Sequence, residues 1–287
     1  MALGLFHYQL LTEVLEKIHY IHDESEMADT VLSGVAGALS AEGGSIFKIL
    51  PDGEIIPLAA YGAPLEVLKK AKFAVGKGVV GWVAEFNQPV KVDNPAQDRR
   101  FQSMIDNTTG FKTRSILAAP ILSRGNAIGV IEFLNRRGGP FAAADLELIS
   151  MVGREIGIAF ENVRLFERLE ESRAIAEAIV NSLVSGVLVM DRQFRLREMN
   201  PAAQKLLLLR YAESDKGPEL VKDVLTAYPE LTQILNDIET THKTIAGQEM
   251  TLMIGEKPTK IVYTAIPIFT PDGTRLGSAI LFREPAP

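Results

Sequence analysis

The chain has 287 residues, of which 47% are hydrophobic and 23% charged, a composition typical of a soluble globular protein with one large or two medium cores. The net charge of −6 disfavours nucleic acid and anionic membrane surfaces as partners, because both attract basic proteins. The absence of cysteine excludes disulfides, thiolate nucleophiles and Cys-bound metals. No basic n-region of a signal peptide is present, and no apolar run reaches the ~18 residues of a membrane span, so we expect a cytoplasmic protein.

The first half of the chain alternates helical and strand patterns. Apolar residues that include Leu11 and Ile18 recur every three or four positions and predict a helix within residues 1–24, with an apolar seam suited to pairing two chains. The following elements are expected, in chain order, as a helix at about 27–39, strands at 45–50 and 54–60, a polar helix at about 64–72, a short strand at 90–93, a polar loop at 98–111, and strands at 114–122 and 127–135. An Asp-Gly turn joins the first two strands, and a turn at Gly125-Asn126 joins the last two.

A long helix is predicted over residues 142–183, where proline is absent and apolar residues keep a spacing of three and four. At ~1.5 Å per residue it would be about 60 Å long, more than one compact domain needs. Such a helix connects two domains, and its apolar seam can pair with a second copy of the chain. The predicted seam contains Ile149, Ile156, Val163 and Phe166, and the pattern slips near residues 170–173.

The second half begins with a hairpin and ends with three strands. Asn200 is the expected N-cap of a helix that starts at Pro201. The other predicted elements are strands at 186–191 and 194–200, short helices near 217–226 and 229–239, and strands near 243–254, 258–269 and 274–283. Both halves therefore predict an α+β fold with two domains, each a central antiparallel sheet with helices packed on it, joined by the long helix.

Three glycines, at positions 76, 78 and 81, match the G-x-G-x-x-G fingerprint of dinucleotide-binding folds. The helix that follows must end before Pro89, so the unit is too short for a parallel crossover, and hairpins flank it on both sides. We therefore interpret the glycines as a turn into a short helix, whose Val80, Trp82 and Val83 pack on a sheet.

Two stretches carry family resemblances. GKGVVGWVAEFNQPVKVDNPAQDRRF (76–101), followed by TRSILAAPIL and GNAIGVIEFLNR, resembles the GAF domain over about residues 10–165. SGVLVMDRQFRLREMNPAAQKLL resembles the start of a PAS domain over about 173–285. The expected organisation is an N-terminal dimerisation helix at 1–24, a GAF-like domain at 25–165, a connecting signalling helix at 142–183 and a PAS-like domain at 184–287.

The GAF resemblance implies a six-stranded antiparallel sheet with a small-molecule pocket. The order of domains resembles the sensory half of bacterial signal-transduction proteins such as sensor histidine kinases. This resemblance implies a non-catalytic homodimer that passes a ligand signal to a kinase, cyclase or transcription-activator output outside this chain. The chain itself is then expected to be a sensor fragment or a stand-alone regulator. A constitutive dimerisation scaffold without ligand is the alternative, and an enzyme with a GAF-like pocket is the least supported because no acid–base set is visible.

The polar loop, taken as residues 98–113, is the candidate cover of the pocket, because it mixes polar with large apolar residues. An ordinary surface loop explains the same mixture. The candidate ligand-binding residues are Trp82, Asp98, Arg100, Phe101, Asn107, Thr109, Phe111 and Ser115. Arg136 and Asp145 occupy positions of the pattern of cyclic-nucleotide GAF domains, but a structural ion pair between strand and helix is favoured over ligand specificity.

No cofactor is identified from the sequence. A bilin or a flavin photoadduct is disfavoured, because the attachment requires a cysteine and no histidine lies between Asp23 and Thr241. Haem is disfavoured because the histidines lie at the N-terminal helix and at His242, away from the expected pockets. His19 and His22 are spaced for a metal, but no third ligand is visible.

Overall fold

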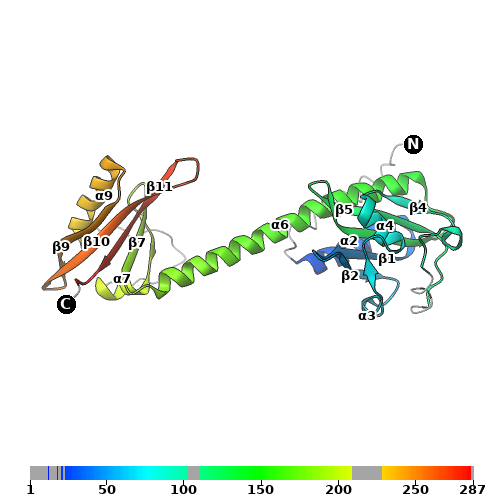
Figure 1. Ribbon diagram of the computed structural model, residues 1–287, viewed down its shortest axis with the longest axis horizontal. Helices are drawn as coiled ribbons and strands as arrows, with labels where there is room; N and C mark the ends of the chain where they lie inside the picture. The colour runs from blue at the N-terminus through cyan, green and yellow to red at the C-terminus, as the bar shows by residue number, and fades with distance from the viewer. Residues whose placement is uncertain are drawn as a thin grey trace. The chain divides into compact units, whose positions relative to one another are not determined.

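A computed structural model of the chain describes residues 12, 18, 21, 23–102, 106, 110–208 and 228–285. The chain divides into two compact units, residues 1–169 and 170–287 (Figure 1). Each unit contains one antiparallel sheet with helices, so the α+β prediction is confirmed. The long helix is also confirmed, as α6 (Ala143–Ser182).

The sheet of the N-terminal unit has six strands in the order β3-β2-β1-β6-β5-β4, and every neighbouring pair is antiparallel. The strands are β1 (Ala41–Ile49), β2 (Glu54–Tyr61), β3 (Phe73–Ala74), β4 (Val90–Val92), β5 (Ile116–Ser123) and β6 (Asn126–Arg136). The turn between β5 and β6 lies one residue earlier than predicted. Arg124 and Gly125 have φ of 51° and 85°, and positive φ at both central residues is what a type I′ hairpin turn requires. Asn126 already pairs with Ser123 in the sheet.

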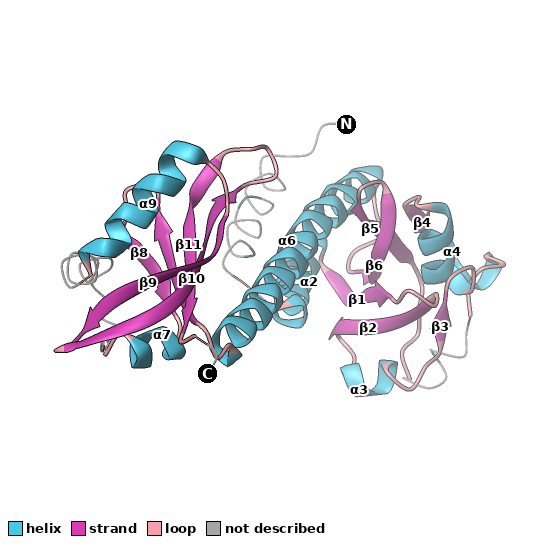
Figure 2. Cartoon of the chain, turned by 60° about the vertical axis from the view of Figure 1, so that its left-hand side comes forward, coloured by secondary structure: helices cyan, strands magenta, loops and turns pink. Residues whose placement is uncertain are grey.

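Helices α2 (Glu24–Leu39) and α6 cover one face of this sheet (Figure 2). Their contact forms the larger core, and it corrects the predicted dimer seam. The seam residues Ile18, Ile149, Ile156 and Val163 are all buried in this core, at 4% exposure or less, so these side chains are not available to a partner chain. Phe166 is 50% exposed, and Leu11 lies outside the described residues.

The opposite face carries α3 (Leu65–Leu68) and α4 (Gly78–Phe86), which form a second apolar cluster with the sheet. The glycine stretch is a turn into α4, as interpreted from the sequence. Gly76 and Gly78 have φ of 79° and 75°, and the Gly76 amide donates to the Gly81 carbonyl oxygen at 2.9 Å. A Cβ on Gly81 would lie 2.2 Å from the carbonyl oxygen of Ala74, so close packing requires a glycine there.

The C-terminal unit has a five-stranded sheet in the order β8-β7-β11-β10-β9. Its elements are β7 (Gly186–Asp191), β8 (Leu196–Met199), α7 (Pro201–Leu206), α9 (Pro229–Thr241), β9 (Ile245–Ile254), β10 (Lys257–Phe269) and β11 (Arg275–Arg283). Asn200 caps α7 as predicted, because its side chain accepts a hydrogen bond from the amide of Ala203. The helix expected near 217–226 lies outside the described residues.

Candidate functional site

A cavity of about 80 Å³ lies on the face of the six-stranded sheet that carries α3 and α4. Its floor comes from neighbouring strands, with Ser45 and Phe47 on β1 and Glu132 and Leu134 on β6. Ser45 pairs directly with Glu132 across the two strands. The small side chain of Ser45, together with Gly43 opposite Leu134, leaves the floor hollow where larger residues would fill it.

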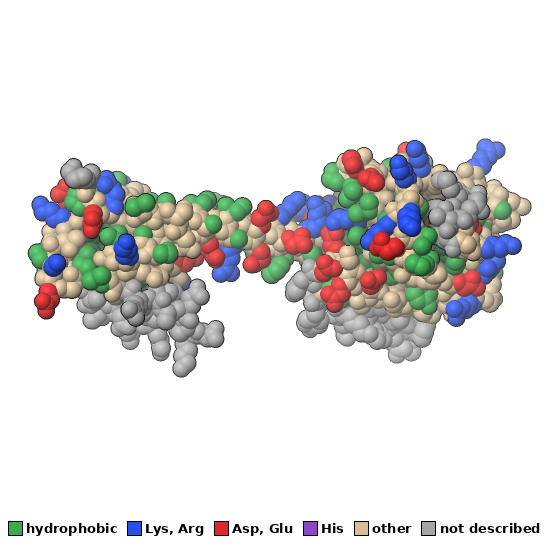
Figure 3. All heavy atoms as spheres, turned by 90° about the horizontal axis from the view of Figure 1, so that it is seen from below, with side chains coloured by type: hydrophobic (Ala, Val, Ile, Leu, Met, Phe, Trp, Pro, Cys, Tyr) green, Lys and Arg blue, Asp and Glu red, His purple; other side chains and the backbone are tan. Residues whose placement is uncertain are grey.

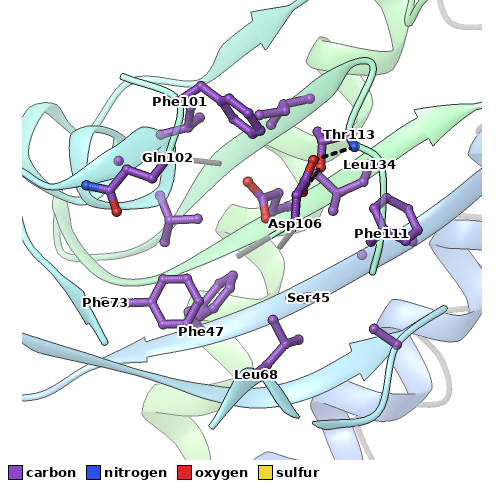
Figure 4. A pocket seen from close by; sticks show the side chains of 18 of the residues that line it. Ser45, Phe47, Leu68, Phe73, Phe101, Gln102, Asp106, Phe111, Thr113 and Leu134 are labelled. Atoms are coloured by element: carbon purple, nitrogen blue, oxygen red, sulfur yellow. Dashed lines mark hydrogen bonds between the residues drawn. The ribbon is translucent and has the colours of Figure 1, made fainter. Parts of the chain in front are cut away.

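The sides of the cavity are largely apolar and aromatic (Figure 4). Phe73 comes from β3, and its ring centroid lies 4.8 Å from that of Phe47. Phe101 and Phe111 come from the segment that joins β4 to β5. Gly43 makes room for Phe111, because a Cβ there would lie 3.1 Å from the Phe111 ring. The cavity is therefore surrounded by four phenylalanine rings.

Two carboxyl groups reach this apolar cavity. Asp106 accepts hydrogen bonds from the Thr113 amide at 2.8 Å and the Thr113 hydroxyl at 2.6 Å (Figure 4). Glu132 keeps some accessible surface because it lines the cavity, but protein surrounds its carboxyl group. That burial, and secondarily the charge of Asp106, raise the pKa of Glu132 to about 7. Glu132 therefore changes its charge near neutral pH.

The structure brings only part of the predicted set to the cavity. Phe101 and Phe111 line it, whereas Trp82, Asp98 and Arg100 do not. Asn107 and Thr109 lie outside the described residues.

Arg100 instead contacts both Asp98 and Trp82. The guanidinium of Arg100 donates to both carboxylate oxygens of Asp98, at 2.9 and 2.7 Å, and lies 4.6 Å from the Trp82 ring centroid. Hydrogen bonds from Arg100 hold the pKa of Asp98 below its usual range. The cluster fastens the start of the 98–113 segment to α4.

Ser115 lies in a second, more polar groove that also contains Arg114, Asn135 and Arg136. The buried Asn135 side chain accepts from the amides of Arg114 and Ser115 at 2.7 and 3.2 Å, so it fixes the end of the same segment. Arg136 bonds Asp145 at 2.7 Å, and Asp145 is 3% exposed. This contact joins β6 to α6, as the structural interpretation of the pair predicts.

Sequence reasoning missed Glu132, although a signal for it exists. The stretch GVIEFLN is apolar on both faces of a central strand, and Glu132 is its one charged residue. A carboxyl group in the middle of a buried strand is costly unless it has a partner or a role.

No group of three or more His, Asp or Glu residues is placed to hold a metal ion within the described part of the chain. None of its helices has both the length and the apolar character needed to cross a membrane. His242 lies at the C-terminal end of α9.

The sequence matches two families, the GAF domain over residues 23–160 and the PAS fold over residues 175–285. The dual 3',5'-cyclic-AMP and -GMP phosphodiesterase 11A of Takifugu rubripes is 40% identical over 139 residues, which are 46% of this chain and 15% of that protein. The probable 3',5'-cyclic phosphodiesterase pde-5 of Caenorhabditis elegans is 32% identical over 104 residues, 36% of this chain and 14% of that protein. The chain thus spans a small part of these relatives.

Solved structures share the fold. The GAF domain of a phosphoenolpyruvate-protein phosphotransferase from Coxiella burnetii has a TM-score of 0.52 at 17% identity, over 56% of this chain and 96% of that one. The E. coli DhaR(N)-DhaL complex has a TM-score of 0.54 at 20% identity, over 99% of this chain and 92% of that one. The chain therefore belongs to the proteins that carry a GAF domain followed by a PAS domain.

Proposed function

We propose that the chain is a non-catalytic sensory module of bacterial signal transduction. A small molecule binds the GAF cavity, the signal passes along α6 in a parallel homodimer, and the PAS domain delivers it to an output domain such as a histidine kinase, cyclase or transcription activator. The observation that carries the proposal is the cavity itself, with an ionisable carboxyl group among four aromatic rings.

The size of the cavity limits the ligand. Ligand pockets commonly measure roughly 300–1,000 Å³, whereas this cavity measures about 80 Å³. A buried water needs about 10–15 Å³ by a comparable measure, so the cavity suits a ligand of roughly five to eight non-hydrogen atoms. A cyclic nucleotide, which the names of the phosphodiesterase relatives suggest as a second candidate, is larger than this space.

An exposed stripe along α6 supports the transmission step. Ile158, Leu165, Leu169 and Ile179 are 56%, 50%, 63% and 56% exposed. Figure 3 shows hydrophobic side chains at the surface along α6. With intervening residues they form a seam with steps of four and three, which we call the α6 stripe. Its members are Ile158, Asn162, Leu165, Leu169, Ser172, Ala176 and Ile179, and the same spacing continues to Leu183, one residue after the end of α6.

The spacing of the α6 stripe favours a second α6 as its partner. A repeat of 3.5 residues keeps facing a neighbour only when two helices supercoil around each other. Asn162 and Ser172 are the polar members of the stripe. An asparagine that a helix pair buries, as it would bury Asn162 near one end of the stripe, specifies register in two-stranded coiled coils. The stripe replaces the seam expected from the sequence, since most of that seam is buried within the GAF domain.

Native mass spectrometry of the purified chain tests both parts of the proposal. A mass of two chains plus a constant small excess supports a ligand-bound dimer, and the excess gives the mass of the ligand. A dimer that carries no excess, and whose melting temperature no small molecule raises, favours the alternative of a constitutive scaffold. Adding cyclic AMP and cyclic GMP to the melting experiment tests the second candidate ligand.

Substitution of the α6 stripe tests the dimer separately. Leu169→Lys places a charge in the stripe, whereas Glu167→Lys places the same charge on the exposed opposite side of the helix. We expect Leu169→Lys to give monomers by light scattering and Glu167→Lys to keep the dimer. Dimers that persist in Leu169→Lys would remove the stripe from the proposal.

A further inference from the structure

The aromatic lining and the carboxyl groups of the GAF cavity together specify a ligand charge. We propose that this cavity binds a compact organic cation, with an ammonium or quaternary ammonium group held between the phenylalanine rings and the carboxylate of Glu132. This ligand class rests on the proposed function, in which the same cavity takes a small molecule.

The aromatic rings supply the first part of the recognition. Phe47 on β1, Phe73 on β3, and Phe101 and Phe111 from the segment between β4 and β5 surround one space (Figure 4). The face of an aromatic ring carries negative electrostatic potential and attracts a cation within about 6 Å of the ring centroid. A cage of several rings therefore favours a cation over a neutral molecule of the same shape.

Glu132 supplies the second part. Its backbone pairs with Ser45 on one side and Ala118 on the other, so the sheet fixes its position. Among the described residues no hydrogen bond or ion pair reaches its carboxyl group, although hydrogen bonds from Thr113 satisfy Asp106 nearby. A carboxylate that faces an apolar cavity without a protein partner is poorly stabilised, and a cationic ligand in the cavity would provide that partner.

The remaining charges around the cavity are few. The other titratable groups in its lining are Asp106, Lys77 and Tyr61. Lys77 is exposed at the rim, where water screens its charge. The N-terminal end of α4 also borders the cavity and favours an anion, so an anionic ligand is the competing outcome that a test must separate.

Three probes of similar shape and different charge make this separation. Tetramethylammonium is the cation, tert-butanol the neutral molecule and trimethylacetate the anion. Each probe has roughly five to eight non-hydrogen atoms, which the cavity can hold at about 10–15 Å³ per water-sized group. Binding to the full chain is measured by calorimetry and by the shift in melting temperature. We expect tetramethylammonium to bind at least about tenfold more tightly than tert-butanol, because the neutral probe lacks the charge that the rings and Glu132 attract.

Variants and pH assign the effect to this site. Glu132→Gln keeps the shape and removes the charge, Glu147→Gln removes the same charge from the exposed surface of α6, and Phe101→Leu removes one ring. We expect Glu132→Gln to weaken tetramethylammonium binding about tenfold or more, and Phe101→Leu to weaken it several-fold. Glu147→Gln should leave this binding unchanged.

The pH dependence provides a readout that loss of structure would not imitate. Tetramethylammonium keeps its charge at all pH values, so only groups of the protein can titrate. Because the pKa of Glu132 is about 7, the carboxylate that binds the cation forms as the pH increases to 7. Below pH 7 the association constant of tetramethylammonium should therefore increase by up to about tenfold for each unit of increasing pH, and above pH 7 it should become constant. In Glu132→Gln this rise should disappear.

The outcomes separate the ligand class from the proposed function. Tighter binding of tert-butanol or trimethylacetate than of tetramethylammonium at this cavity would overturn the cation and leave a small-molecule sensor intact. Equal binding by Glu132→Gln and the unmodified chain would also overturn it. A failure of all three probes, together with no ligand excess in native mass spectrometry, would overturn both.

Discussion

Asn200 offers a quantitative test of how the PAS domain is fastened at its start. Its buried side chain accepts hydrogen bonds from the amides of Val187 and Ala203 at 2.8 and 2.9 Å, and donates to the carbonyl oxygens of Val180 and Ser185, both at 3.0 Å. One residue thus joins the end of α6, the first strand β7 and the helix α7. Asn200→Ala removes all of these contacts at once.

The expected loss follows from these contacts. An N-cap contributes about 1 kcal/mol, and a buried polar group left without its hydrogen bond costs about 1–3 kcal/mol. We expect Asn200→Ala to lower the free energy of unfolding of the PAS domain by about 2–4 kcal/mol, the sum of these two terms. Asn200→Ser keeps a capping oxygen and should lose less, and the exposed Asn181→Ala should lose almost nothing.

The chain contains its own control for the assay. Its single tryptophan, Trp82, lies in α4 of the GAF domain, so Trp fluorescence during urea unfolding reports that domain, whereas far-ultraviolet circular dichroism reports both. Asn200→Ala should shift the dichroism transition of the PAS domain and leave the Trp82 transition in place. A loss below about 1 kcal/mol, which is the value of the cap alone, would refute the reasoning about Asn200.

Two further predictions concern the GAF domain. Gly81→Ala should lower the free energy of unfolding of the GAF domain by about 1–3 kcal/mol, because the new Cβ meets backbone at 2.2 Å. Gly37→Ala in α2 meets nothing within 4 Å and should raise that free energy by about 0.5–1 kcal/mol. Urea unfolding followed by Trp82 fluorescence measures both variants, and equal effects would contradict the packing argument. The raised pKa of Glu132 means that the folded state holds this proton more tightly than the unfolded state, so its contribution is present below about pH 4.5 and is lost as the pH rises to about 7. Relative to Glu132→Gln, the unmodified chain should lose up to about 3 kcal/mol over that range, and parallel stability curves would contradict the shift.

Local patterns were sufficient for much of the fold. Alternating apolar residues and turn residues located every strand of both sheets except the two-residue β3, and the Asn200-Pro201 pair located the start of α7. The short helix after Gly81 separated a structural turn from a dinucleotide fingerprint. These features succeed because each depends on neighbours within a few residues, which the sequence places together directly.

The two faces of α6 show what local patterns leave open. Ile149, Ile156 and Val163 follow the same three-and-four spacing as Ile158 and Leu165. The first set is buried against the sheet of its own domain and the second is exposed. A periodic pattern indicates that a helix has an apolar partner, but only the packing of the whole domain decides which partner covers which face.

The cavity likewise required the tertiary structure. The sequence by itself determined two α+β domains, a long helix between them and a loop-rich segment with large apolar residues, two of which, Phe101 and Phe111, do line the cavity. The sequence did not single out Glu132. Strand pairing places Glu132 opposite Ser45, and folding brings the charge of Asp106 close to it. The pKa of a carboxyl group depends on solvent and charges brought near it by residues distant in the chain, so its role is set by folding and not by its own position in the sequence.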